Sequence, residues 1–226
     1  MDNTPVIILA GGFGTRLSTL VKDVPKPMAD INGKPFLHYI FQSLQKQNLQ
    51  KVILSVGHLK EVIQDFFKDQ YLGIEVQYAI EQGPLGTGGG IQNAFTLVED
   101  DAYVINGDTY FEIPLANLKR VNTDITIALK PMLHFNRYGT VSLNTANRVI
   151  AFHEKKECAE GLINGGIYYF KKSLFEKIST DRKFSFEKEV LEKHLNAITI
   201  QGMIFDNYFI DIGIPEDYQK AQLDFK

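Results

Sequence analysis

The chain has 226 residues, of which 44% are hydrophobic, so it is long enough to bury one sizeable core. A formal net charge of -3 and an isoelectric point near 6.0 exclude a general attraction to nucleic acid or to acidic membranes, because the basic residues are scattered without a run. Any anionic ligand must therefore be bound at a local site. We expect a single domain over residues 1–226.

The first half of the chain alternates apolar runs with helical patterns. Val6 to Ala10 is a β-branched run too short for a helix and predicts a buried parallel strand. An amphipathic helical pattern from Leu37 to Leu44 leads to a second strand at Lys51 to Val56, which makes a βαβ unit. The alternation continues with a helix at Leu59 to Phe67, a strand at Ile74 to Ile80, a glycine-rich loop at Gly83 to Gly90, a short helix near Ile91 to Leu97 and a strand at Ala102 to Asn106.

The second half is less regular. Helical patterns are present at Phe186 to Leu195 and after Pro215, where an early proline followed by acidic residues is a helix start signal. The predicted strands are Asp124 to Lys130, Gly139 to Leu143, Arg148 to Phe152, Ile163 to Phe170 and Ala197 to Phe205. The fold class expected is α/β, with a wound, mostly parallel mixed sheet flanked by helices and a small, partly antiparallel lid.

Cysteine usage and the N-terminus indicate the compartment. Cys158 is the single cysteine, so no disulfide can form within the chain, and a reducing environment fits. The start of the chain has no basic segment, and no apolar run approaches the length of a membrane span. These features predict a soluble cytoplasmic protein with no membrane partner, while homo-oligomerisation is left open.

A glycine-rich turn follows the first predicted strand. In Leu9 to Leu17 the glycines would let backbone N–H groups approach phosphate oxygens without a Cβ in the way. The turn lacks the GK[ST] of a P-loop, and Leu17 stands where a dinucleotide fingerprint has its third glycine. Arg16 and Lys26, the latter held between two prolines, add fixed cations to the turn. The alternative is an ordinary turn with solvated basic residues.

Motifs spread over the whole chain resemble the sugar-1-phosphate nucleotidylyltransferase family. GGxGTRL is followed by Lys26-Pro27-Met28, and later segments match the family's GD, EK, NAGIY and DIGTPEDY motifs. The departures are Lys156 in place of proline, Gly165 in place of alanine and Ile214 in place of threonine. None of these changes a charge that the chemistry needs. The resemblance implies a Rossmann-like nucleotidyltransferase fold that transfers a nucleotide from a nucleoside triphosphate to a sugar 1-phosphate.

The resemblance also implies roles for individual residues. Catalysis is assigned to Arg16, Lys26 and Asp108, and Asp108 with Asp211 would bind Mg²⁺, a cation that takes one or two protein carboxylates. Each aspartate alone is more typical of a turn. The nucleotide would contact Leu9, Ala10, Gly11, Gly12, Gly14, Thr15, Glu81, Gly86 and Thr87. The sugar phosphate would contact Gly139, Glu154, Lys155 and Asn164. Taken singly, Lys155 fits a solvated charge run and Asn164 a turn.

The segment Glu81 to Thr87 resembles the family's base-reading loop. A glutamate at position 81 offers two acceptors, which suit the N1–H and 2-amino donors of guanine and therefore predict GTP. Leu85-Gly86-Thr87 resembles guanylyltransferases for mannose 1-phosphate and heptose 1-phosphate, and the overall resemblance is greatest to the bacterial enzymes for D-glycero-D-manno-heptose 1-phosphate, which implies surface polysaccharide assembly. Uridylyl transfer to an amino sugar phosphate and a non-catalytic nucleotide-sugar sensor are the alternatives. A sensor should lack a charged catalytic position, and none is missing here.

Overall fold

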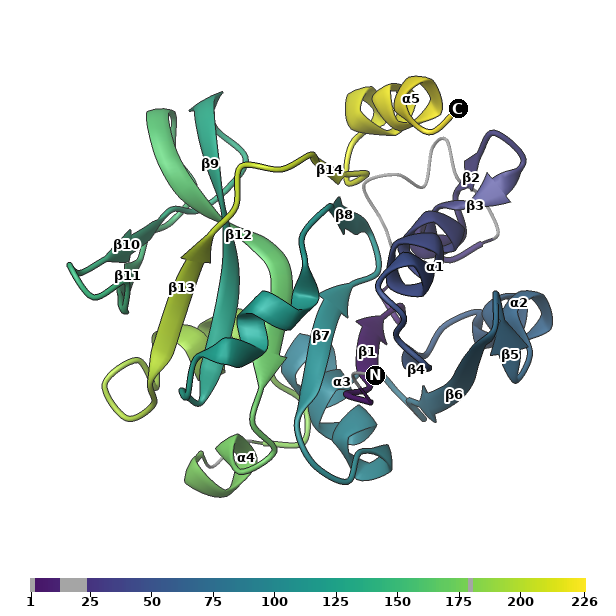
Figure 1. Ribbon diagram of the computed structural model, residues 1–226, viewed down its shortest axis with the longest axis horizontal. Coiled ribbons are helices and arrows are strands. Elements are labelled where there is room, and N and C mark those ends of the chain that lie inside the picture. Colours follow the sequence, from purple (N-terminus) through teal and green to yellow (C-terminus); the bar gives the residue numbers. More distant parts are fainter. Residues whose placement is uncertain (1–2, 13–23, 179–180) are drawn as a thin grey trace.

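The computed structural model describes residues 3–12, 24–178 and 181–226, and within them the strands form one eight-stranded sheet and three two-stranded ones. The order in the large sheet is β13-β9-β12-β7-β1-β4-β6-β5, as Figure 1 shows. Its strands are β1 (Val6–Leu9), β4 (Lys51–Val56), β5 (Gln70–Tyr71), β6 (Ile74–Ile80), β7 (Ala102–Asn106), β9 (Ile125–Phe135), β12 (Cys158–Phe170) and β13 (Ile200–Ile204). The small sheets pair β2 (Asp30–Ile31) with β3 (Lys34–Pro35), β8 (Thr109–Phe111) with β14 (Phe209–Asp211), and β10 (Val141–Leu143) with β11 (Val149–Phe152).

Strands β1, β4, β6 and β7 form the parallel half of the sheet, as the sequence predicts. Leu9 at the end of β1 pairs with Ser55 on one side and with Asn106 on the other. Val56 of β4 pairs with Ile80 of β6, so all four strands end at one level. The carboxyl edge of a parallel sheet is where a wound α/β fold binds ligands.

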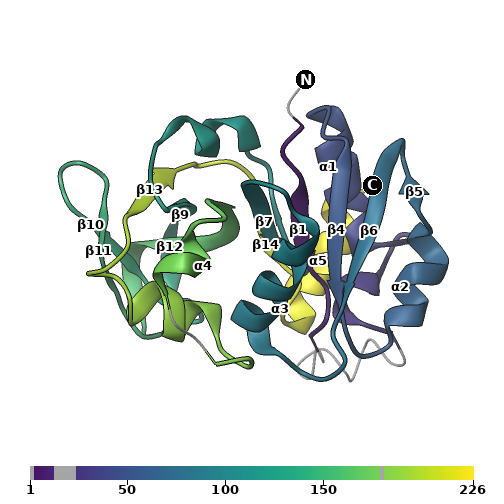
Figure 2. The same cartoon turned by 90° about the horizontal axis from the view of Figure 1, so that it is seen from below.

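The other half of the sheet is mixed. Strand β12 runs antiparallel between β7 and β9, while β13 pairs parallel with β9. Both β9 and β12 are longer than predicted, because beyond the sheet they continue as an antiparallel arm in which Cys158 pairs with Phe135. The β10–β11 ribbon lies beside this arm, at the opposite end of the molecule from β5 (Figure 2). This arm and ribbon form the partly antiparallel region expected from the sequence.

Helices cover both faces of the sheet, and alternate strand residues separate two core layers. Val6 and Ile8 belong to the layer that includes α1 (Phe36–Lys46), α2 (Lys60–Phe67) and α5 (Pro215–Asp224). Ile7 belongs to the layer that includes α3 (Gly86–Ala94), α4 (Leu174–Lys177) and a π-helix at Glu187–Glu192. A strand buried on both faces reads as a continuous apolar run, which explains why β1 could be predicted. None of the described helices is both long and apolar enough to cross a bilayer.

The start of α3 differs from the prediction. Helix α3 begins at Gly86, whereas the sequence indicated a loop up to Gly90 and a helix from Ile91. Glycine disfavours helices, but close packing decides this segment. A Cβ on Gly88 would lie 2.1 Å from the ring of Phe184, and one on Gly89 would lie 2.6 Å from the carbonyl oxygen of Arg182. The glycines therefore let the chain at 182–184 pack directly on the helix.

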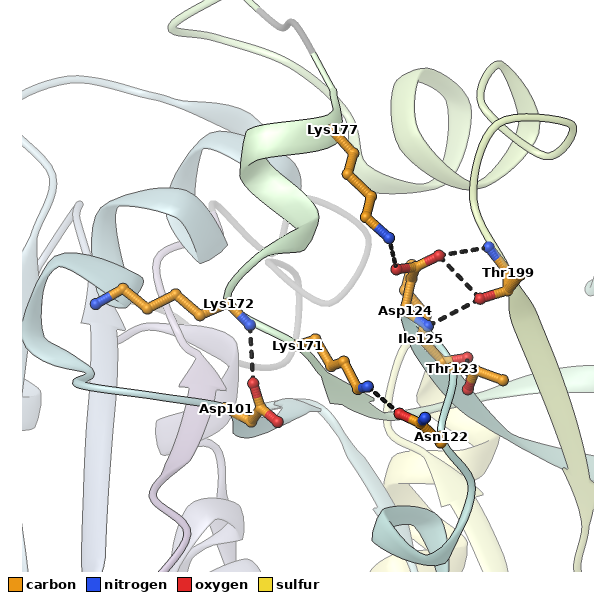
Figure 3. A network of polar contacts seen from close by, with 9 residues as sticks. All are labelled: Asp101, Asn122, Thr123, Asp124, Ile125, Lys171, Lys172, Lys177 and Thr199. Carbon is orange, nitrogen blue, oxygen red and sulfur yellow. Dashed lines mark hydrogen bonds and ion pairs between the residues drawn. The ribbon is translucent and has the colours of Figure 1, made fainter.

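A polar network holds the amino ends of the strands, opposite the edge described above (Figure 3). The carboxylate of Asp124, which precedes β9, accepts hydrogen bonds from Lys177 Nζ at 2.5 Å and from N and Oγ1 of Thr199 at 2.7 and 2.8 Å. Asp101, before β7, accepts hydrogen bonds from the backbone N–H of Lys172 and the hydroxyl of Tyr169. These contacts connect the starts of β7, β9 and β13 to α4 and the end of β12.

Candidate active site

A cavity of about 560 Å³ lies at the carboxyl edge of the parallel strands. Leu9, Ser55 and Asn106 line it because the sheet register places them at one level. Glu81, directly after β6, lines the same cavity, and its N–H donates to the carbonyl of Val56. The sheet thus brings together residues from four separate segments of the chain.

Two aspartates meet at one end of this cavity. Asp211 ends β14 and pairs with Thr109 of β8, the residue that follows Asp108. The N–H of Ile212 donates to the carbonyl of Asp108, which closes the pairing. Gly107 is required here, since a Cβ would lie 2.5 Å from the carbonyl oxygen of Leu9. The short β8–β14 pair therefore places the two carboxylates side by side, 103 positions apart in number (211 minus 108).

Lys26 lies between the two aspartates. Its Nζ is 2.6 Å from Oδ2 of Asp108 and 3.6 Å from Oδ1 of Asp211, and its side chain is only 14% exposed. A 3₁₀ turn at Lys26–Met28, with Pro25 before it and a buried Pro27 within it, fixes the lysine backbone. Lys26 is thus a rigidly placed cation, as its two flanking prolines predict.

The environment of Asp211 is suited to a cation. Burial raises the pKa of its carboxyl, the charge of Asp108 raises the pKa further, and Lys26 opposes both effects. Oδ1 of Asp211 is buried and accepts no hydrogen bond from any residue in the described parts of the chain. Buried carboxylate oxygens are normally hydrogen-bonded, so this oxygen, which lies 3.6 Å from Lys26 Nζ without a hydrogen bond, can accept a further partner. Among the described residues no three His, Cys, Asp or Glu side chains gather as a metal site.

Glu81 forms the other end of the cavity. Its Oε2 accepts a hydrogen bond from the N–H of Leu85 at 3.0 Å, and Oε1 accepts one from the Ser55 hydroxyl at 3.3 Å. Burial raises the pKa of the carboxyl, against the lowering effect of these two bonds. A carboxylate has about four acceptor positions, so about two remain for a ligand. Gly11 and Gly90 pack on the same side chain, and a Cβ on either would lie within 3.0 Å of Oε1.

A second cavity, of about 580 Å³, adjoins the first. Both are lined by Asn106, Glu187, Asp211 and Gly213. Gly139, Glu154, Lys155 and Asn164, the residues assigned to the sugar phosphate from the sequence, line the second cavity together. The Asn164 amide is held in place, since its Oδ1 accepts from Gly166 N–H and its Nδ2 donates to the Tyr168 hydroxyl. Gly166 adopts φ +71° at a bulge in β12, where a glycine is favoured.

Most of the residues expected at the site line one of the two cavities. The first is lined by Leu9, Gly11, Gly12, Lys26, Glu81, Gly86, Thr87, Asp108 and Asp211. Ala10 does not line either cavity: it is buried, and its N–H donates to the carbonyl of Ser55. Gly14, Thr15 and Arg16 lie outside the described residues.

The cavities also contain residues that were not expected from the sequence, among them Asn106, Arg137 and Glu187. Asn106 directly precedes the GD motif, so the motif itself could have pointed to it. Arg137 directly precedes Tyr138-Gly139, and its Nη2 lies 2.5 Å from Oδ2 of Asp217. Glu187 stands in a charged segment with no motif, and hydrogen bonds with Thr87 and Ser185 hold it at the site.

Comparison with known proteins identifies the arrangement. A family model described as nucleotidyl transferase matches residues 5–226. The chain belongs to the nucleotidyl transferase family. It is therefore a nucleotidyltransferase, and its wound mixed sheet is the fold of that family.

Similar proteins match this nucleotidyltransferase over nearly its whole length. It is 51% identical to D-glycero-α-D-manno-heptose 1-phosphate guanylyltransferase from Campylobacter jejuni, over 94% of this chain and 96% of the relative. It is also 51% identical to the enzyme of the same name from Aneurinibacillus thermoaerophilus, over 96% of each chain. The crystal structure of HddC from Yersinia pseudotuberculosis complexed with GMP-PN superposes with a TM-score of 0.89 at 39% identity, covering 99% of this chain and 100% of that one.

Proposed function

We propose that this nucleotidyltransferase transfers the GMP part of GTP to D-glycero-α-D-manno-heptose 1-phosphate and releases pyrophosphate. An oxygen of the sugar phosphate forms a bond to the α-phosphorus of GTP, and the bond from that phosphorus to the β-phosphate bridging oxygen breaks. The electron pair leaves with pyrophosphate, and the product is a GDP-heptose. The names of the two relatives that are 51% identical support this choice of substrates.

The proposal rests on one observation: the two cavities meet beside one positive charge, that of Lys26. Asp211 and Gly213 line both cavities, and Lys26 lies 3.6 Å from Asp211. A triphosphate in the first cavity and a sugar phosphate in the second would meet beside this lysine. Two separate ligand spaces that converge on a positive charge fit a reaction between two anions.

The chemistry needs positioning and charge cancellation. The attacking oxygen belongs to a phosphate that is ionised at neutral pH, so no general base is required. Two unit charges about 4 Å apart interact by about 4 kcal/mol at an effective dielectric constant near 20, so repulsion between the substrates is a large part of the barrier. We assign Lys26 to the α-phosphate and the attacking phosphate, Arg16 to the triphosphate and Lys155 to the sugar phosphate.

The carboxylates of Asp108 and Asp211 would hold Mg²⁺. The unpartnered, buried Oδ1 of Asp211 and the neighbouring Asp108 carboxylate fit a hard cation that keeps several waters. When bound, Mg²⁺ would neutralise charge on the phosphates. Lys26 lies between the two carboxylates. If these held a cation, the Lys26 Nζ would be available to phosphate oxygens.

Glu81 is proposed to read guanine. Its carboxylate keeps about two acceptor positions beyond those used by Leu85 and Ser55, which match the two donors on the pairing edge of guanine. Uracil has one ring N–H and cannot use both. Hydrogen bonds to a charged partner contribute about 1.5 to 3 kcal/mol, which corresponds to roughly a tenfold to hundredfold preference.

A substrate panel tests the proposal. GTP, UTP, dTTP and CTP are each combined with heptose, mannose, glucose and N-acetylglucosamine 1-phosphates, and pyrophosphate release is measured. We expect GTP with the manno-configured heptose to be best and mannose 1-phosphate to be slower. The Glu81→Gln variant should lose roughly tenfold of the GTP preference. UTP as the best nucleotide for the wild type would refute the role of Glu81, and glucose 1-phosphate as the best acceptor would refute the heptose assignment.

We further propose that residues 1–226 act as one catalytic domain in the cytoplasm and that the nucleotide sugar serves polysaccharide biosynthesis. A GDP-activated sugar has a good leaving group at its anomeric carbon, so a glycosyl transfer is the class of reaction that would consume it. Cell fractionation checks the compartment: activity that sediments with membranes would contradict it. Loss of heptose from surface polysaccharide in a deletion strain would support the pathway assignment.

A further inference from the structure

Two hydrogen bonds join the backbone of Phe184 to the residues at the start of α3, beside the first cavity. The N–H of Phe184 donates to the carbonyl of Leu85, and the N–H of Gly88 donates to the carbonyl of Phe184. A Cβ on Gly86 would lie 2.5 Å from the Phe184 carbonyl oxygen. The first turn of α3 and the segment before the π-helix are thus built as one unit.

Glu187 extends this unit into the sugar cavity. Its Oε2 accepts hydrogen bonds from the hydroxyls of Thr87 at 2.9 Å and Ser185 at 3.0 Å. The Thr87 hydroxyl in turn accepts from the N–H of Phe186 at 2.9 Å. Glu187 lines both cavities, although it is 100 residues from Thr87 in the sequence. One oxygen of this carboxylate is therefore fixed by the nucleotide side of the site.

The second oxygen of Glu187 is uncommitted. Within residues 3–12, 24–178 and 181–226, Oε1 of Glu187 accepts no hydrogen bond, while Oε2 accepts two. A carboxylate accepts hydrogen bonds and cannot donate them when ionised. It repels phosphate, so the group of a sugar phosphate that it can bind in this cavity is a neutral donor. A sugar supplies such donors as hydroxyl groups, and the ring lies beyond the phosphate that Lys155 is assigned to hold.

We propose that Glu187 determines acceptor specificity by taking a hydrogen bond from a ring or side-chain hydroxyl of the sugar. This inference rests on the proposed function, because it requires a sugar phosphate in the second cavity. Thr87 and Ser185 act as positioning residues, which fix Oε2 and thereby orient Oε1. A carboxylate held in this way selects for a hydroxyl at one position of the sugar, and a sugar without that hydroxyl leaves the charge without a partner.

Steady-state kinetics of Glu187→Ala test the role, with the best acceptor from the substrate panel whatever its identity. The KM for the sugar phosphate should rise about 10- to 100-fold, and the KM for the nucleotide should change less than about threefold. Glu187→Gln, which keeps the shape of the side chain, should give a smaller rise of the sugar KM. The matched control is Glu176→Ala on α4, because Glu176 is exposed and lines neither cavity. Its sugar KM should stay within about threefold of the wild type.

Deoxy analogues of the same acceptor make the test specific. If Glu187 binds one hydroxyl, the sugar phosphate lacking that hydroxyl should bind wild type and Glu187→Ala equally, while the other analogues should retain the difference between the two proteins. Titration calorimetry with a non-hydrolysable triphosphate present measures this binding without turnover. The inference would be overturned if Glu187→Ala lost the same binding affinity for every analogue, or if only its KM for the nucleotide rose. A wild type that binds no sugar phosphate would overturn both this inference and the proposed function.

Discussion

The ammonium group of Lys26 lies 2.6 Å from Oδ2 of Asp108, across 82 residues of sequence. The positive charge of the buried lysine and the negative charge of this carboxylate cancel within the ion pair. Asp211 is close enough to share the lysine at 3.6 Å but is not hydrogen-bonded to it. One cation for two carboxylates leaves the site with a net negative charge of about one, which a divalent cation can balance.

Removing either aspartate charge should abolish metal-dependent turnover without unfolding the protein. Asp108→Asn and Asp211→Asn each keep an oxygen but take one charge from the site, and we expect turnover to fall by at least about 100-fold. Addition of Mg²⁺ should raise the melting temperature of the wild type and raise that of Asp211→Asn much less, because at a given concentration a cation that binds the folded state more tightly stabilises it more. Pyrophosphate release and thermal melts with Mg²⁺ or a chelator measure both effects. Near wild-type turnover of either variant at limiting Mg²⁺ would remove that aspartate from the metal site.

Lys26 and Arg16 should differ in the kind of kinetic loss that their removal causes. Lys26→Ala should lower kcat by about 100-fold or more, because this cation is placed where the two phosphates react. Arg16→Ala should weaken triphosphate binding together with kcat, and the fall in kcat/KM gives the lost transition-state stabilisation. Initial rates over a range of both substrates separate the two patterns. Unchanged kinetics in both variants would make the glycine-rich segment a structural turn.

The Asp124 network should contribute stability that is lost in acid. Burial alone would raise the pKa of the Asp124 carboxyl, but hydrogen bonds from Lys177 and Thr199 outweigh it, so that the pKa in the folded state lies below its ordinary value. The contribution to the free energy of unfolding is therefore complete above the ordinary carboxyl pKa of about 4 and is lost as pH falls through the lower folded-state pKa. Asp124→Asn should cost about 1 to 2 kcal/mol at pH 7.

Urea denaturation of wild type and Asp124→Asn between pH 7 and pH 3 measures this difference. We expect the difference in unfolding free energy to shrink toward zero below about pH 4. The kinetic constants should be unchanged, because the network lies at the amino ends of β7, β9 and β13, whereas the first cavity lies at the carboxyl edge of the parallel strands. A difference that stays constant over the whole range would show that the ionised form of Asp124 has no special role.

Gly88→Ala should destabilise the protein although alanine is a better helix former. The added Cβ would lie 2.1 Å from the Phe184 ring, so the ring and the chain that carries it must shift. Overpacking of this kind costs about 1 to 3 kcal/mol, which exceeds the gain of about 1 kcal/mol in helix propensity. Gly83→Ala is the control, because a Cβ there meets nothing within 4 Å. Chemical denaturation compares the two variants, and a Gly88→Ala protein as stable as the wild type would contradict the packing account.

The parallel strands β4, β6 and β7 have the bounds predicted from the sequence. β4 and β7 are apolar runs buried on both faces of the sheet, whereas β6 mixes buried residues with exposed ones such as Glu75 and Ile80. The start of α3 could not be predicted, because it depends on contacts with Phe184, nearly a hundred residues later. The far ends of β9 and β12 were missed for a similar reason, since residues 131–135 pair with residues 158–162, which are distant in the sequence.

The residues of the candidate site also fall into two groups: those in distinctive local motifs, and those that only tertiary contacts place at the site. Lys26, Asp108 and Asp211 stand in motifs whose local sequence is distinctive, so they could be assigned together before their distances were known. Glu187 and Arg137 are brought in by tertiary packing, through Thr87 and Asp217 respectively. A charged residue in a charged segment carries no local signal of the partner that it will meet.

The bulge in β12 divides one strand between two tasks. Residues 168–170 pair with both β7 and β9, whereas residues 158–164 pair with β9 and, through Ile163, with Thr140, and border the second cavity through Asn164. Insertions or substitutions before the bulge can therefore reshape the acceptor side while the strand order around β1 and β7 stays intact. Chimeras that exchange the arm at this bulge should inherit the acceptor range of one parent and the nucleotide preference of the other. The bulge is therefore a position at which enzymes that catalyse the same reaction can differ in the sugars that they activate.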